Sequence, residues 1–270
     1  MVSNETQLIN ISKNTSEKHY YKQVADFEVS RIRADVPFAD LYGEYDADGH
    51  SITIASSDST TGDVAVLFQE HLEIVVKNLT TYSRENGLLC VFESYENGST
   101  ITLSNIKTRV VDNATVKINN SNSPFLLHGH TSSGNIITIE NCDVNGSLTN
   151  TGTCTAAFIG GGLGWSSTFG GRYTTLTMRN CSYTGKITGS AQAGLILGNA
   201  THFNYVTFEQ ADSFITLDNV VNAGTISAIS NAGGIFSTAN TIAVELGQKY
   251  VAAIGGSYIK GDNVLTLSLI

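Results

Sequence analysis

The sequence predicts an all-β protein: a right-handed parallel β-helix with three strands per coil and an N-terminal cap. The main observation is a repeated pattern, in which an apolar residue, Thr, an apolar residue, any residue and Asn are followed by a Gly five residues after the Asn. The pattern occurs at residues 137–148, 176–187 and 215–226, and successive Asn residues are 39 positions apart. A constant period of this length indicates structural units that stack on one another.

The composition supports the same fold class. Hydrophobic residues make up 41% of the 270-residue chain, which is enough to form a core. Gly is abundant with 26 residues, Pro occurs only twice, and the apolar runs are short and rich in Ile, Val, Leu and Thr. Short runs of this kind, broken by Gly, Asn and Asp, are typical of strands joined by turns.

The Asn of each copy is expected to lie at a corner of its coil. There its side chain can bond to backbone amides and to neighbouring coils, which satisfies polar groups that would otherwise be buried without partners. The apolar residues on either side of the Thr point inward, and the Thr points outward. Shorter spacings between the first copies are explained by turns of different length. The corner residues predicted in this way are Asn78, Asn105, Asn141, Asn180 and Asn219.

Two parts of the chain are distinguished by the repeat. Residues 1–44 lack it and are expected to form a cap over the first coil, whereas residues 45–270 are expected to form the β-helix. Residues 264–267 are expected to be the last copy of the first strand. This leaves the last coil open to a partner, to an identical chain or to further sequence.

The residue before each Asn is a candidate for chemistry on the outer surface. Glu140, Arg179 and Asp218 occupy this place on successive coils and alternate in charge. We interpret them as an exposed charge ladder. The alternative is a glycosidase acid pair, because Glu140 and Asp218 would lie roughly 9–10 Å apart on coils spaced like neighbouring strands.

Cys142 and Cys181 follow the Asn in two successive copies. Their Cα atoms are expected to lie about 5 Å apart, which would permit a disulfide. We favour a stack of small, buried and reduced side chains instead.

A Gly-rich stretch at residues 160–171 interrupts the repeat. It lacks the Lys and the following helix of a phosphate-binding loop, so we interpret it as an excursion from one coil. Its aromatic side chains are the candidates for contact with a partner. They are Trp165, Phe169 and the nearby Tyr173.

Charge and residue spacing exclude several classes of partner. The net charge of −9 and the isoelectric point near 5.0 argue against nucleic acid. No apolar run is long enough to insert into a membrane as a helix, and the Cys and His residues have no metal-ligand spacing, so we expect neither metal nor cofactor. The first residues lack the basic and apolar parts of a secretory signal, which predicts a cytoplasmic protein, or a cell-surface one if the chain is a fragment.

The paired motifs also resemble a known repeat. Thr-apolar-X-Asn-Cys, followed later by Ala-Gly-Gly-Ile-Phe at residues 232–236, is similar to the GLUG-type repeat of adhesin-like β-helix proteins and to repeats of polymorphic outer-membrane proteins. The likeness covers residues 45–245. It implies a right-handed parallel β-helix that serves display, adhesion or scaffolding, and it brings no catalytic residues.

These observations together predict a non-enzymatic structural or interaction protein. It would be a rigid scaffold within a larger assembly, such as a cytoskeletal one, with protein partners and with glycans as a second class of ligand. Ten Asn-X-Ser/Thr sequons and the family likeness leave a cell-surface adhesin as the first alternative. The charge ladder leaves a carbohydrate-active enzyme as the second.

Overall fold

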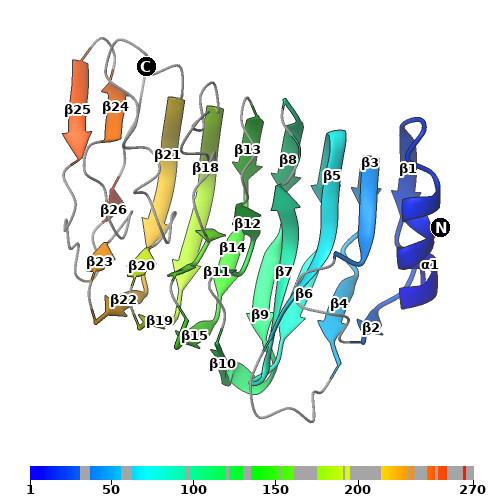
Figure 1. Cartoon of the computed structure of the whole chain (residues 1–270), viewed down its shortest axis with the longest axis horizontal. Helices are drawn as coiled ribbons and strands as arrows, with labels where there is room; N and C mark the ends of the chain where they lie inside the picture. Colours follow the sequence, from blue (N-terminus) through cyan, green and yellow to red (C-terminus); the bar gives the residue numbers. More distant parts are fainter. Residues whose placement is uncertain are drawn as a thin grey trace.

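The computed structural model confirms an all-β fold that is dominated by a large parallel sheet. Successive strands lie side by side along the long axis of the molecule, from β1 beside the N-terminal helix to β24 and β25 at the other end (Figure 1). The structure describes residues 1–30, 37–55, 63–94, 96, 98–119, 122–129, 135–152, 154–160, 175–190, 192–194, 214–229, 231–233, 242–246, 249–253 and 264–265.

The chain begins with short helices that lie at one end of the strand array. The side chain of Asn4 accepts a hydrogen bond from the Gln7 N–H and so caps the first helix. Leu8 and Ile11 are buried against the first strands. The elements of this part are α1 (Glu5–Ile9), the 3₁₀ helix η1 (Asn10–Lys13), β1 (His19–Lys22) and β2 (Phe27–Val29).

Four sheets contain the strands that follow. The largest has 16 strands, and its main path runs β17-β12-β7-β5-β8-β13-β18-β14-β9-β6-β4-β2, with β1 joined to β3 and β3 to β5. The first half of its strands are β3 (Ala39–Asp46), β4 (Ser51–Ile54), β5 (Asp63–Lys77), β6 (Thr80–Ser83), β7 (Gly87–Ser94), β8 (Thr100–Ser104), β9 (Lys107–Val110) and β12 (Leu127–Gly129). Besides β1, β2 and β26 (Val264–Leu265), the other strands of this sheet are β13 (Ile136–Glu140), β14 (Asp143–Asn145), β17 (Ile159–Gly160), β18 (Thr175–Thr184) and β21 (Phe214–Asn222).

Two smaller parallel sheets repeat the same succession. One has the order β10-β15-β19-β22, and the other has the order β11-β16-β20-β23. A 3₁₀ turn, η2 (Val111–Asn113), leads into the first of them. Their strands are β10 (Thr115–Ile118), β15 (Ser147–Asn150), β19 (Lys186–Gly189), β22 (Thr225–Ala228), β11 (Asn122–Pro124), β16 (Cys154–Ala156), β20 (Gln192–Gly194) and β23 (Asn231–Gly233).

The 39-residue period is visible in the strand register. Thr138 on β13 pairs with Thr177 on β18, which pairs with Thr216 on β21. The chain contributes strands to the sheets in the same order in each unit, so that equivalent strands become parallel neighbours. The unit from residue 136 to residue 160 contains five strands, β13 to β17, more than the three expected per coil. Three of the five, β14, β16 and β17, are only two or three residues long, which is too short for an alternating sequence pattern to reveal.

Apolar side chains from equivalent positions stack to form the core. The aromatic rings of Phe68 and Phe92 lie on paired strands, followed in register by Leu127 and Ile159. All four are fully buried. A second column, which follows the predicted inward positions, consists of Ile74, Ile101, Ile137 and Leu176.

The C-terminal end differs from the prediction. Residues 264–267 were expected to add a parallel copy of the first strand. Instead, β26 (Val264–Leu265) pairs antiparallel with β21 through Val220 and Val221. The strands β24 (Ile242–Leu246) and β25 (Lys249–Ala253) form a separate antiparallel pair. The pair of β24 and β25 is antiparallel because only two residues separate the strands, whereas a parallel pair needs a long crossover.

Candidate functional site

The five predicted corner residues share one backbone conformation. Asn78, Asn105, Asn141, Asn180 and Asn219 have φ between 51° and 56°. This left-handed region disfavours most side chains by about 1–2 kcal/mol, but Asn tolerates it because its short amide bonds locally. The recurrence of Asn at this place in the repeat therefore has a conformational cause.

The side chains of these residues form a ladder that is hydrogen-bonded in two segments, Asn78 with Asn105 and Asn141 with Asn180 and Asn219. The amide of Asn105 donates to Asn78 at 3.0 Å, that of Asn180 donates to Asn141 at 3.3 Å, and that of Asn219 donates to Asn180 at 2.9 Å. Asn78 in turn donates to the Asp46 carboxylate at 2.9 Å. A carboxylate only accepts such bonds, so Asp46 gives the ladder a definite first acceptor.

The outer row beside the ladder has the predicted register. Lys77, Ser104, Glu140, Arg179 and Asp218 are successive partners on neighbouring strands. Glu140 and Asp218 thus lie two strands apart, with Arg179 between them. No ion pair joins these three side chains in the described structure, and Arg179 and Asp218 are exposed.

Cys142 lies between β13 and β14, Cys181 lies in the neighbouring β18, and both are free and buried. The Cys142 thiol donates to the carbonyl of Glu140 at 3.3 Å, and the Cys181 thiol donates to that of Arg179 at 3.2 Å. Burial raises the pKa of Cys142. The pair lies 1% exposed inside the core.

The three aromatic candidates for partner binding, Trp165, Phe169 and Tyr173, lie outside the described residues. The described part of that unit ends at Gly160, whose register partner is His128 on β12.

Sequence reasoning missed a polar cluster at the corner where β5 changes partners. The first part of β5 pairs with β7 and the second part with β8, so the strand turns from one face of the molecule to the next. We call this group the β5 corner cluster. It consists of Asp40, Tyr42, His71, Leu72 and Glu96.

A bulge creates the cluster. Between β3 and β5 the register passes from Leu41–Glu70 to Gly43–Ile74, so that Tyr42 alone faces three residues of β5. The middle one, Leu72, has φ of +63° and is 48% exposed. Bulges of this kind re-aim side chains and are frequent beside functional sites. Burial of the Leu72 side chain in the core does not compensate for this strained conformation, because the side chain is exposed.

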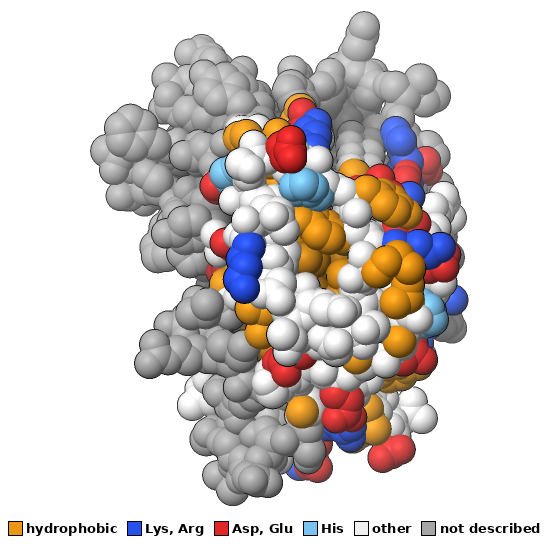
Figure 2. All heavy atoms as spheres, turned by 90° about the vertical axis from the view of Figure 1, so that its right-hand side faces the viewer, with side chains coloured by type: hydrophobic (Ala, Val, Ile, Leu, Met, Phe, Trp, Pro, Cys, Tyr) orange, Lys and Arg blue, Asp and Glu red, His pale blue; other side chains and the backbone are white. Residues whose placement is uncertain are grey.

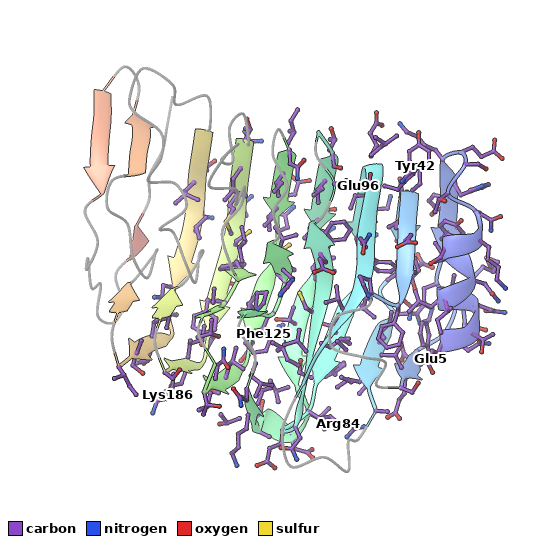
Figure 3. All side chains as sticks on the ribbon, in the orientation of Figure 1. Glu5, Tyr42, Arg84, Glu96, Phe125 and Lys186 are labelled. Atoms are coloured by element: carbon purple, nitrogen blue, oxygen red, sulfur yellow. The ribbon has the colours of Figure 1, made fainter. Side chains whose placement is uncertain are left out.

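The side chain of Glu96 fixes the bulge. One carboxylate oxygen lies 3.2 Å from His71 Nδ1, and the other accepts a hydrogen bond of 3.3 Å from the Leu72 N–H. The ring of Tyr42 meets the imidazole edge-to-face, with ring centroids 5.2 Å apart. Tyr42 and Glu96 lie at the same edge of the molecule, and Arg84 lies at the opposite edge (Figure 3).

Asp40 lies two residues before Tyr42 and belongs electrostatically to the cluster. Desolvation by the surrounding atoms raises its pKa, His71 lowers it, and the negative charge of Glu96 raises it further. The net direction is upward, so Asp40 retains its proton to a higher pH than an ordinary Asp.

The outer row of the cluster continues onto the next strands. Asp40 pairs in register with Gln69, Gln69 with Glu93, and Glu93 with His128. His128 Nδ1 lies 3.0 Å from the Glu93 carboxylate, and the side chains of the two are 17% and 11% exposed. The face therefore carries two His–carboxylate pairs.

The only sequence signal for this cluster is the length of β5. Residues 63–77 form 15 consecutive strand residues without the Gly or Asn that marks other corners. The partner carboxylate, Glu96, comes from a different connection, so neither residue identifies the other in the sequence.

Within the described residues, no three His, Cys, Asp or Glu side chains are grouped so that they could hold a metal ion. None of the helices in the described ranges is long and apolar enough to cross a membrane.

Comparison with known proteins gives no family assignment. No protein-family model matches the chain, and no curated protein matches it. Among solved structures, the chain is similar to one described as a "putative immunoglobulin A1 protease from Bacteroides ovatus". That match has a TM-score of 0.43 and 15% sequence identity, and it covers 97% of this chain and 81% of that chain. At this level of similarity no activity is transferred.

Proposed function

We infer that the chain is a right-handed parallel β-helix that serves as a non-enzymatic structural or interaction protein. The observation that carries this inference is the Asn ladder. The same left-handed corner recurs in register in successive units, from Asn78 to Asn219. This arrangement requires the backbone of each unit to follow the same course. The repeated succession of parallel sheets supports the same architecture.

A rod of this kind suits a scaffold. Each unit contacts only its neighbours, and the outer strand faces present regular rows of side chains to partners. At the end that carries α1, hydrophobic side chains gather near the centre and charged side chains border them (Figure 2). Met1 and Tyr20, at the N-terminal end of the chain, are 77% and 59% exposed.

The scaffold proposal includes protein partners within a larger assembly and a cytoplasmic location. It is tested by crosslinking the full chain in its native source, followed by identification of its neighbours. We expect a defined and reproducible set of proteins. Recovery of the monomer alone would contradict the scaffold role, and a compact rather than elongated particle in small-angle scattering would contradict the β-helix.

The GLUG-like resemblance and the sequons support a cell-surface adhesin as the second proposal. Their geometry makes it testable. Asn113 and Asn145 are exposed sequon residues, whereas the amides of Asn78 and Asn180 are engaged in the ladder. Mapping of glycans on the native protein distinguishes the two locations, because occupancy at Asn113 or Asn145 requires passage through a secretory route.

The enzyme alternative rests on Glu140 and Asp218. The row formed with Arg179 arises directly from strand register, so a charge ladder explains it without catalysis. We expect Glu140→Gln and Asp218→Asn to leave any glycan cleavage by the native protein unchanged. A loss of cleavage in either variant would establish the enzyme instead.

A further inference from the structure

The β5 corner cluster has features that its place in the fold does not explain. The other described residues with positive φ are Asn, Asp or Gly, whereas this corner uses Leu72. The Leu side chain is half exposed instead of packed in the core. Strain of this kind persists only where the surrounding structure enforces it, and here the enforcing group is the Glu96 carboxylate.

The cluster is also organised before any ligand arrives. Glu96 holds both His71 and the Leu72 backbone, and Tyr42 supports the imidazole from the side. A ligand would therefore meet an apolar side chain, a phenol ring and fixed hydrogen-bonding groups without first ordering them. Such preorganisation reduces the entropic cost of binding.

The side-chain pairs of the cluster favour a neutral ligand. The carboxylates of Glu96 and Glu93 are each already engaged by a His ring, at 3.2 and 3.0 Å. A cationic segment would have to compete with His71 and His128 for the same carboxylates. A polyol has no such competition, because each hydroxyl both donates and accepts and can use carboxylate, imidazole and phenol groups together.

The row of polar side chains has the length of a chain of sugar units rather than of a single ring. Asp40, Gln69, Glu93 and His128 occupy successive strands, which places the first and last roughly 14 Å apart by ordinary strand spacing. Leu72 and Tyr42 lie beside the start of this row and can contact the C–H face of a sugar.

We propose that the β5 corner cluster, with the adjoining row from Gln69 to His128, is a binding site for a neutral oligosaccharide. The inference rests on the interaction role proposed above, of which it names one class of partner. Scattering and crosslinking test the scaffold proposal, whereas sugar titration tests the oligosaccharide site. A failure of one proposal can therefore be distinguished from a failure of the other.

The test is calorimetric titration of the full chain with a panel of neutral hexasaccharides: cello-, manno-, xylo-, malto- and chitohexaose. We expect at least one of them to bind with a Kd below about 1 mM. Tyr42→Ala and Glu96→Gln should each weaken that binding about tenfold or more. Leu72→Asn should weaken it as well, and it should fold normally because Asn tolerates the left-handed conformation.

Matched controls lie on other strands. Tyr82→Ala changes a half-buried Tyr of β6, and Glu85→Gln changes an exposed Glu that is paired with Lys117. Both should bind like the wild type. Three results would overturn the proposal: no hexasaccharide binds up to about 10 mM, the cluster variants bind as tightly as the controls, or only a Lys-rich peptide included in the panel binds.

Discussion

At the scale of single residues, glycines decide how closely two units approach. Gly185 has φ of +140°, and a Cβ built on it would overlap the carbonyl of Gly146 in the preceding unit. Gly49 also has positive φ, +86°, but a Cβ there would have no neighbour within 4 Å. Substitution at Gly49 therefore introduces backbone strain alone, whereas substitution at Gly185 introduces strain and steric overlap.

We expect Gly49→Ala to lower the free energy of unfolding by about 1 kcal/mol, through strain alone. Gly185→Ala should lower it by about 3 kcal/mol or more, because the backbone of a neighbouring unit must move. Urea unfolding of both variants measures the difference. Equal losses would show that the stacked corner is loose enough to accommodate a methyl group.

The Asn residues combine a conformational and a hydrogen-bonding role, which two substitutions distinguish. Asn180→Gly keeps the left-handed corner and loses the amide contacts to Asn141 and Asn219. Asn180→Ala loses the same contacts and also disfavours the left-handed conformation, so it should be about 1 kcal/mol less stable than Asn180→Gly in urea unfolding. If the Gly variant is no more stable than the Ala variant, the left-handed conformation is not what this corner requires.

At the scale of elements, the Asn ladder and the repeated first strand could be predicted from the sequence, because a fixed period and an alternating pattern determine them. The β5 corner could not. Two extra residues of β5 lie opposite Tyr42, so the alternation of inward and outward side chains shifts within this strand. The carboxylate that contacts the corner, that of Glu96, comes from another connection. The pairing of β26 was missed because residues 264–267 repeat the apolar alternation, which gives no information about strand direction.

The start of the ladder predicts a pH dependence. Partial burial raises the pKa of Asp46, but hydrogen bonds from Asn78 and the Asp48 N–H, together with the Lys77 charge, outweigh it, and the pKa lies below the ordinary value. A carboxyl with a lowered pKa stabilises the fold above its unfolded-state pKa of about 3.9 and loses this contribution as the pH falls through the folded-state value.

Asp46→Asn should therefore lower the free energy of unfolding at neutral pH by about 1 kcal/mol. The difference from the wild type should vanish at acidic pH below the lowered folded-state pKa, where the native carboxyl is protonated as well. Urea unfolding at both pH values measures it. A difference that widens on acidification would mean that Asp46 destabilises the ladder.

At the scale of the whole molecule, the stacked units differ in how their two ends are closed. The first unit is covered by α1 and η1, which bury Leu8 and Ile11. At the other end, the described strands are the antiparallel pair β24 and β25 and the short β26, which pairs with β21 over two residues. In a stack whose units contact only their neighbours, opening should begin at the less protected end and progress towards the other.

The three described free thiols can report this order, since they lie at different depths in the stack. Cys90, Cys142 and Cys181 are all buried, and burial raises the pKa of Cys90 to about 12. Their thiols should therefore react only when their units open. In a Cys154→Ser background, which removes the remaining thiol, Cys181 should be alkylated first, Cys142 next and Cys90 last, as measured by peptide mass spectrometry over time in mild urea. Simultaneous labelling of all three would instead show that the stack unfolds as one cooperative body, in which the N-terminal helices protect distant units as strongly as near ones.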